Sequence, residues 1–378
     1  MLNLLTSLFT FTQLIALLLF PNLKNALTLD AHYFVIIFAI GSLCFLIMAP
    51  HWSKLMNKIG AKKVILIGCL GLVVSQLLLI QILTGNETHI AVFALSRIVY
   101  GLFVSALPPT LQALRVKDAD EKEIYKKIVG HSKYLNLGRV MAALSFTLYP
   151  FSKVHLLVFA ITLVLMSTFL MNQDYRPKNT VNRDDNLIVI LMGLYKKTPY
   201  PFLTALIYTC FIGFINSTLA FEFERLGLEK SSAGEAMAIA VFLSTLMALI
   251  AQILLKRKEL PSYYLSASLI IGSLIFISGF NYLNLAMAFI IFTPGVALLP
   301  ATYTSKLKDQ VSSDMTIKLG LISSLQIIGA TLGSLIASLY LKYQLVINYG
   351  IPLALMGLMI MTVLYLGDKK RENECLIV

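Results

Sequence analysis

Long, mainly apolar runs separated by short polar clusters make up almost all of this chain. A helix needs about 20 such residues to cross the hydrocarbon core of a bilayer. Breaking the sequence at its polar and Gly/Pro clusters leaves twelve runs of about this length. They cover residues 3–20, 33–50, 64–83, 91–111, 131–150, 155–172, 200–221, 235–255, 263–281, 285–304, 319–341 and 349–367. The pattern therefore predicts an all-α polytopic membrane protein with about twelve transmembrane helices.

Most connections between these runs are a few residues long, and the longest follows the sixth run. Within it, "DDNLIVILMGLYKK" (184–197) predicts a short helix that lies in the membrane interface. We expect residues 1–172 to form an N-terminal six-helix half and residues 173–199 a cytoplasmic linker. Residues 200–367 would form a C-terminal six-helix half, and residues 368–378 a cytoplasmic tail.

Composition agrees with this pattern, because 58% of the 378 residues are hydrophobic and 13% are charged. A soluble domain has about 45–50% apolar and about 25% charged residues. The first twenty residues lack the basic start and the cleavage site of a secretory signal, so we expect them to be the first span. The four cysteines (Cys44, Cys69, Cys210, Cys375) do not have the spacing of disulfides or of a zinc site. We expect no metal and no cofactor.

Lysine and arginine are concentrated in alternate connections, namely those after the second, fourth, sixth, eighth and tenth runs, and in the tail. Cytoplasmic loops carry such an excess, so we expect both termini in the cytoplasm. The net charge of +12 then reports orientation in the membrane, and we expect no nucleic-acid partner.

The connection after the second run, "PHWSKLMNKIGAKKVILIG" (Pro50 to Gly68), resembles the signature loop of the major facilitator superfamily, Gly-x-Leu-x-Asp-Arg-x-Gly-Arg-Arg. The matching residues are Leu55, Lys58, Gly60, Lys62 and Lys63. Ser53 replaces the first glycine and Asn57 the aspartate, which in the family takes part in a charge relay that closes the cytoplasmic side. The resemblance implies a cytoplasmic gate at Asn57, Lys58, Gly60 and Lys62, although Asn57 cannot form an ion pair. A generic basic turn is the alternative.

The fourth run, "ALSRIVYGLFVSALPPTLQALR", resembles the family's Arg-x-x-x-Gly element at Arg97 and Gly101. The second half repeats parts of the first, since residues 295–309 parallel 101–118 and Gly329 aligns with Gly138. The resemblance implies two pseudo-symmetric six-helix halves, as in many transporters. We expect five residues to serve close helix packing: Gly101, Pro108, Gly138, Gly329 and Gly333.

The fifth run suggests a subgroup. Twelve-span drug:proton antiporters of the superfamily often carry Gly-Arg-x-x-Gly-Pro there, and Gly138 and Arg139 match this motif. Ala142 and Ala143 replace its Gly-Pro, which weakens the assignment to drug exporters. The chain thus resembles the group of drug:proton antiporters and siderophore exporters.

Two arginines fall within predicted spans. Arg139 lies about nine residues past Gly130, hence roughly 13 Å into the membrane. A cation at that depth costs about 3 kcal/mol on insertion scales, so its side chain must face protein or water. Ser132, Asn136, Arg139 and Ala143 share a narrow arc of the helix, with Lys133 at its edge. The fifth helix lines the central cavity in this superfamily, so the resemblance places this stripe on the substrate path. Arg97 and Arg139 either bind an anionic substrate or modulate a protonation site, or they only hold the N-terminal half together.

Carboxylates are the other candidates, and they gather around the seventh and eighth runs at Glu222, Glu224 and Glu235. Glu222 is the deepest, and a carboxyl at an apolar mouth can exchange protons near neutral pH. We expect Glu222, with Glu224, to couple protons to transport. The alternative is an exposed helix end in which either acid pairs with Arg225. Weaker cavity candidates, which could equally serve packing, are Thr6, Thr10, Gln13, Asn216, Ser323 and Gln326.

No Gly-x-x-x-x-Gly-Lys-Ser/Thr loop occurs, so ATP would not drive this protein directly. We expect that the protein is not an enzyme. Instead, we expect a proton-driven secondary transporter that exports a small amphiphilic and anionic compound by alternating access. A carboxylate siderophore is one such cargo, and a drug-like molecule is another. Uptake of an organic anion or sugar is the alternative, and a receptor or scaffold without transport is the third hypothesis. The expected partners are a small-molecule substrate, protons and the lipid bilayer. We expect a monomer in a bacterial cytoplasmic (inner) membrane.

Overall fold

The computed structural model describes residues 1–85, 90–117, 121–148, 153–171, 175, 187–227, 230–254, 262–279, 281–308, 315–343 and 348–375. These residues form helices and short connections, without a strand in the described ranges. The first half of the chain contains α1 (Leu2–Leu18), α2 (Phe20–Ala26), α3 (Ala31–Ile59), α4 (Ala61–Thr84), α5 (Ile90–Val99), the π-helix η1 (Tyr100–Val104), α6 (Leu107–Val116), α7 (Glu121–Leu148) and α8 (Lys153–Phe169). The second contains α9 (Leu187–Lys197), α10 (Pro199–Arg225), α11 (Lys230–Leu254), α12 (Ser262–Ile277), α13 (Tyr282–Lys308), α14 (Met315–Tyr343) and α15 (Gly350–Cys375).

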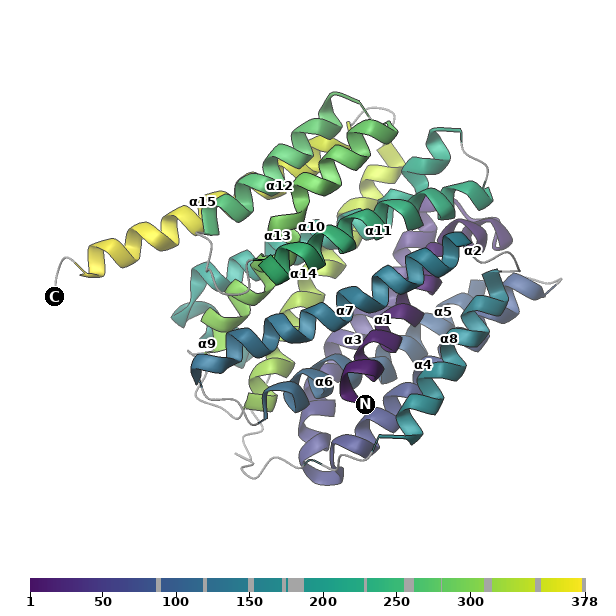
Figure 1. Cartoon of the computed structure of the whole chain (residues 1–378), viewed down its shortest axis with the longest axis horizontal. Helices are drawn as coiled ribbons and strands as arrows, with labels where there is room; N and C mark the ends of the chain where they lie inside the picture. The colour runs from purple at the N-terminus through teal and green to yellow at the C-terminus, as the bar shows by residue number, and fades with distance from the viewer. Residues whose placement is uncertain are drawn as a thin grey trace.

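The all-α membrane fold predicted from the apolar runs is confirmed. Each predicted run falls on one helix or on consecutive helices, and α9 coincides with the predicted interfacial segment. Eight helices of the described residues are long and apolar enough to cross a membrane, and the bent pair α1–α2 makes a ninth. The apolar helices 153–169 and 263–277 are shorter. Figure 1 shows the helices side by side in a bundle, with the end of α15 extending beyond it.

Proline explains the bend in the first span. The axes of α1 and α2 differ by 47°, and Pro21 stands in the first turn of α2. A proline lacks the N–H group that continues a helix, and its ring clashes with the carbonyl four residues earlier. The chain therefore restarts as a new helix at Phe20, in a different direction.

The fourth span is broken as well, into α5, η1 and α6. Pro108 and Pro109 at the start of α6 cannot donate the backbone hydrogen bonds that a continuous helix needs. Just before them, the Ala106 N–H donates to Phe103 O over 3.1 Å, one residue short of the α-helical acceptor. The run predicted at 91–111 is thus a helix with a π turn in its middle.

Two glycines show that the halves share a packing pattern. A Cβ atom on Gly138 of α7 would collide with Ser7 O and Thr10 Oγ1 of α1, and one on Gly329 of α14 would collide with Leu206 O and Thr209 Oγ1 of α10. The partners are three residues apart in both cases. The aligned glycines of the internal repeat therefore make the same close helix contact in each half.

Two long helix pairs join the first half of the chain to the second. Helix α3 packs along α14, and α7 packs along α11, which Figure 1 shows lying side by side. Phe34 of α3 and Phe221 of α10 meet edge to face with their ring centroids 6.0 Å apart. One buried apolar cluster runs through both halves, and a second fills the part of the N-terminal half around Trp52, Leu72 and Leu107. Polar side chains along these seams are the candidates for function.

Candidate functional site

Arg97 lies deep in the N-terminal half, between two aromatic rings. Its guanidinium carbon is 4.3 Å from the ring centroid of Phe38 on α3 and 4.3 Å from that of Tyr100 on η1. Only 5% of the residue is exposed, and its Nε atom has no hydrogen-bond partner in the described part of the chain. The rings stabilise the cation through its faces, so the donors on its edge remain available to an acceptor.

Gln13 of α1 holds the ring that covers Arg97, because its Nε2 atom donates to the hydroxyl of Tyr100. The other members of the predicted stripe on the first span do not share this position. Thr6 and Thr10 are buried, and their hydroxyls donate to backbone carbonyls, that of Thr10 to Leu135 O of α7 over 2.9 Å. Of these three candidates, only Gln13 reaches the surroundings of an arginine.

Arg139 faces the interior of the bundle. The lipid-facing row of α7 is formed by four exposed apolar residues at helical spacing: Leu137, Met141, Leu144 and Leu148. Arg139 is two positions from Leu137 and from Met141, hence on the opposite side of the helix. It is exposed all the same, and Asn136, to which it donates a hydrogen bond, also bonds to Gln252 of α11 in the other half. The exposed surface of Arg139 therefore opens between the two halves.

Gln252 of α11 ties the two halves together next to this arginine, and the sequence analysis missed it. Its fully buried amide accepts from Asn136 Nδ2 over 3.4 Å, and donates to Ser132 Oγ over 2.9 Å and to Ala297 O of α13 over 3.2 Å. Asn136 Oδ1 also accepts a 3.4 Å bond from Arg139. One polar residue within the apolar run "ALIAQILL" was the only signal in the sequence. Lys133 is half-buried and forms no hydrogen bond or ion pair with a described residue.

Tyrosines form the opposite wall, in the C-terminal half. The Tyr208 hydroxyl donates to Val296 O of α13 over 3.0 Å, and its ring lies 5.8 Å from that of Tyr303. Gln326 Nε2 of α14 donates to the Tyr303 hydroxyl over 2.9 Å. Gln326 thus supports the tyrosine wall, whereas Asn216 of α10 is exposed and Ser323 is buried.

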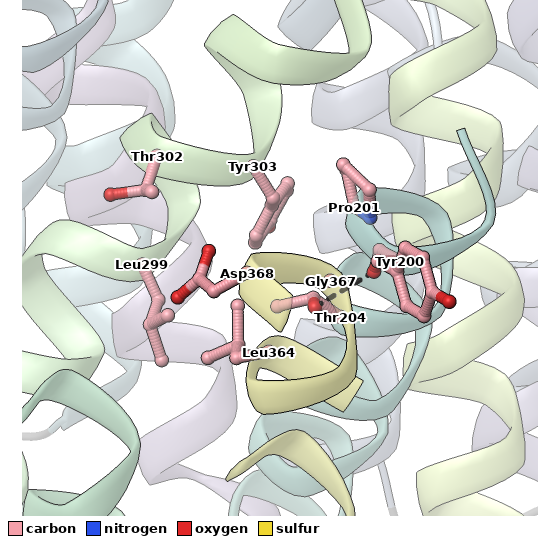
Figure 2. A pocket seen from close by; sticks show the side chains of 9 residues that line it. All are labelled: Tyr200, Pro201, Thr204, Leu299, Thr302, Tyr303, Leu364, Gly367 and Asp368. Atoms are coloured by element: carbon pink, nitrogen blue, oxygen red, sulfur yellow. Dashed lines mark hydrogen bonds between the residues drawn. The ribbon is translucent and has the colours of Figure 1, made fainter. Parts of the chain in front are cut away.

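A small pocket lies behind this wall, between α10, α13 and α15 (Figure 2). Tyr303 is part of its lining, together with Leu299, Leu364 and the exposed Asp368. The pocket lies at the end of the C-terminal half where α10 begins and α13 ends. It is separate from the two arginines of the N-terminal half.

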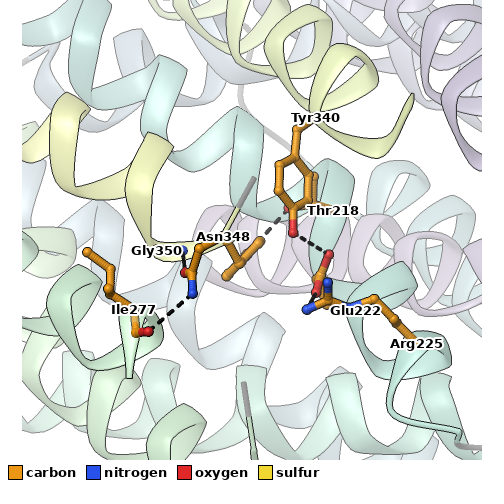
Figure 3. Close-up of polar contacts among 8 residues, drawn as sticks. Thr218, Glu222, Arg225, Ile277, Tyr340, Asn348 and Gly350 are labelled. Atoms are coloured by element: carbon orange, nitrogen blue, oxygen red, sulfur yellow. Dashed lines mark hydrogen bonds and ion pairs between the residues drawn. The ribbon is translucent and has the colours of Figure 1, made fainter. Parts of the chain in front are cut away.

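Glu222 is fully buried near the other end of α10. Its Oε1 accepts a 2.8 Å hydrogen bond from the hydroxyl of Tyr340 on α14 (Figure 3). Its Oε2 lies 2.9 Å from Arg225 Nη2, an ion pair without hydrogen-bond alignment. The alternative of an exposed acid is therefore wrong for Glu222, although the pairing with Arg225 is present.

Two ion pairs cross between the halves at this same, predicted outer, end. Lys24 of α2 pairs with Glu224 of α10, and both side chains are mostly buried. Lys153 Nζ of α8 lies 3.4 Å from Glu235 Oε1 of α11. Glu224 thus has a partner in the other half of the chain, whereas Glu222 has its partners within its own.

The predicted gate residues lie where α3 ends and α4 begins, with Gly60 between the two helices. Gly60 has a φ of 88°, a conformation that favours glycine, and Lys58 and Lys62 are exposed. The next residue, Ala61, donates its N–H to Tyr175 O over 2.9 Å. The side-chain oxygen of Asn57 is buried without a hydrogen-bond partner among the described residues. The described residues thus offer this oxygen of Asn57 no donor.

Comparison with known proteins identifies the family to which this chain belongs. Residues 2–316 match the family model described as Major Facilitator Superfamily, and no curated protein matches. Among solved structures, the chain is similar to the nucleoside transporter NupG, with 11% identity, a TM-score of 0.69 and coverage of 97% of this chain and 98% of that chain. The human organic anion transporter MFSD10 (TETRAN) has 15% identity and a TM-score of 0.66, with 96% and 97% covered. A D-xylose-proton symporter has 11% identity and a TM-score of 0.71, with 96% and 95% covered. At these identities the likeness shows the fold alone.

Proposed function

Because the chain belongs to the Major Facilitator Superfamily, we propose that it exports a small amphiphilic anion in exchange for protons. One observation carries the proposal, namely that Arg97 is buried and its Nε–H has no hydrogen-bond partner among the described residues. An unpaired buried cation is costly, and a carboxylate that accepts bonds from the guanidinium edge would remove that cost. Arg97 is therefore assigned to the substrate.

The charges around Arg97 favour an anion over a cation. Arg139 adds a second cation that opens between the halves. The helices α1 to α6, α8 and residues 127–148 of α7 contain no aspartate or glutamate. A pump for lipophilic cations would need an acid in this region. In this proposal, Arg97 and Arg139 both serve the anion, and no carboxylate on these helices competes with it.

Glu222 is the proton-coupling group in this proposal, and Glu224 assists at the ion pair with Lys24. A buried carboxyl with one tyrosine donor and one cation can exist with and without its proton. Asn57, Lys58, Gly60 and Lys62 close the cytoplasmic side, as the resemblance of their loop implies. The protein works as a monomer in a bacterial cytoplasmic membrane, with both termini inside, as the excess of Lys and Arg in alternate connections indicates.

Export is favoured by the resemblance of the fifth span to the antiporter motif at Gly138 and Arg139, although Ala142 and Ala143 replace the Gly-Pro of that motif. A carboxylate siderophore or a drug-like acid has the required chemistry. The second candidate is uptake of an organic anion or sugar, because the fold is shared with an organic anion transporter and with a sugar–proton symporter. The direction of net flux separates the two candidates.

The test is mass spectrometry of the spent medium of wild-type and deletion cells grown in low iron. We expect a polycarboxylate that is missing outside the deletion cells and accumulates inside them. The wild-type chain should restore its release, and the Arg97→Gln chain should not. Identical media would contradict siderophore export, and flux directed only inward would establish the uptake alternative. A chain that moves no compound in either direction would be a receptor or scaffold.

A further inference from the structure

Trp52 connects the cytoplasmic part of α3 to the backbone of η1. It is the only tryptophan of the chain, it is 6% exposed, and it stands five residues before Asn57. Its Nε1–H donates a 2.7 Å hydrogen bond to the carbonyl oxygen of Leu102. A side chain of α3 thus bonds to the main chain of the fourth span.

The Leu102 carbonyl is free for this bond because of the π turn. In an α-helix it would accept the N–H of Ala106, but that N–H donates to Phe103 O instead. Trp52 Nε1 and the hydroxyl of Ser105 both donate to the Leu102 carbonyl, over 2.7 and 3.0 Å. Closing the turn to an α-helix would give this carbonyl its usual partner. The bond from Trp52 therefore stabilises the π turn over the α-helical alternative.

The π turn decides where the ring over Arg97 lies. Tyr100 is the first residue of η1, and its ring covers one face of the guanidinium. Phe38 of α3 covers the other face. Helix α3 thus supplies both a ring that packs on Arg97 and, through Trp52, the bond that stabilises the turn carrying the second ring. Because rings cover both faces of the guanidinium, an acceptor can reach it only at the N–H groups on its edge.

We propose that Trp52 is a positioning residue of the Arg97 site, and this rests on the proposed anion binding at Arg97. By holding the π turn, it keeps Tyr100 over Arg97 and directs the donors on the guanidinium edge toward the substrate. Helix α3 also packs along α14 of the other half. When the halves move against each other and shift α3, both Phe38 and Trp52 move with it, and both change the surroundings of Arg97.

The test compares Trp52→Phe, which keeps an aromatic ring but loses the N–H, with Ser53→Ala as the matched control. Ser53 is the next residue on α3 and equally buried, but its hydroxyl donates only within the helix, to Ala49 O over 3.3 Å. The full chain is purified in lipid nanodiscs with arginine labelled at Nε with ¹⁵N. The Arg97 signal is assigned from its loss in Arg97→Lys.

In the wild type, the two rings should displace the Arg97 Nε–H resonance from the other arginine signals. Trp52→Phe should move it back toward them and raise the hydrogen exchange of residues 100–106, whereas Ser53→Ala should change neither. An unchanged resonance in Trp52→Phe would overturn the proposal. The double variant Pro108→Ala/Pro109→Ala tests the same link if Trp52→Phe folds poorly. It lets the turn close to an α-helix, and it should move the resonance in the same direction.

Transport gives the second readout. Trp52→Phe should raise the KM for the exported anion about fivefold, the effect of one hydrogen bond, with little change in kcat. An equal fall of kcat in Trp52→Phe and Ser53→Ala would show a general structural role and overturn the proposal. The resonance of Arg97 needs no substrate. A wild type with a displaced resonance but no anion transport would therefore contradict the proposed function alone.

Discussion

At the scale of single residues, the sequence reveals a charge in an apolar run but not its neighbours. Arg97 and Arg139 could be identified as candidates because a cation inside a span is expensive. Phe38, Tyr100 and Gln252 could not, because an aromatic or amide side chain in a span is usually a packing residue. Their contacts with the arginines and with Asn136 depend on how distant helices meet.

We predict that Arg139→Gln abolishes export while the amount of protein in the membrane stays near that of the wild type. Its side chain opens between the halves, and among the described residues it donates one hydrogen bond, of 3.4 Å to Asn136, so we expect the fold to be kept without it. Flux into proteoliposomes and quantitative blotting are the measurements, with Lys342→Gln, which removes an exposed cation near the end of α14, as control. Normal transport by Arg139→Gln would refute its role at the substrate, and loss of the protein from the membrane would make it structural.

Glu222 gives a prediction about pH. Export by the wild type should depend on the external pH, because Glu222 takes up and releases the transported proton in the proposal. Glu222→Gln keeps an acceptor for Tyr340 but cannot ionise, so any residual transport should not change with pH. The control is Glu235→Gln, which removes a partly exposed carboxylate at the same end. A pH dependence that survives in Glu222→Gln would exclude this residue.

At the scale of elements, the length of an apolar run predicts where a helix lies, and prolines within or beside the run change its shape. The predicted runs coincide with helices because the hydropathy of about 20 residues is a local property. The bend at Pro21 and the π turn before Pro108 were not predicted, although both prolines stand in the sequence. Whether a helix bends, restarts or widens at a proline depends on which groups satisfy the freed carbonyls. At η1 that group is Trp52, which lies on another helix.

The repeated glycine contact predicts a stability difference. Gly138→Ala should destabilise the protein by about 1–3 kcal/mol, because its Cβ atom would collide with backbone and side-chain atoms of α1. Gly193→Ala in α9 should have no such effect, because a Cβ atom there meets nothing within 4 Å. Thermal unfolding of the two variants in detergent is the comparison. Equal melting temperatures would mean that α1 and α7 can separate at little cost.

At the scale of the whole molecule, the described residues join the two halves by different chemistry at two places along the seam. Ion pairs join the halves at the predicted outer end, at Lys24–Glu224 and Lys153–Glu235. Near Arg139, the halves are joined by the neutral amide of Gln252. The pattern of charges in the sequence predicted which end faces outward, but not that acids and bases of different halves would meet there.

A charge exchange tests the outer contact. Lys24→Glu should place two carboxylates against each other, weaken closure of the outer end and lower transport. The double variant Lys24→Glu/Glu224→Lys restores opposite charges and should recover most of the activity. The measurement is flux in proteoliposomes for Lys24→Glu, for Glu224→Lys and for the double variant, which together form a double-mutant cycle. A double variant no better than either single one would show that the pair does not close this end.

The difference between the two described contacts also means that dissolved ions act on them unequally. Ions screen partly exposed charge pairs but leave a buried neutral amide almost untouched. A rise in the salt concentration of the medium would therefore loosen the ion pairs at the predicted outer end, while the buried hydrogen bonds of Gln252 stay in place. The fraction of time for which the predicted outer end is open thus depends in part on the salt concentration outside the cell.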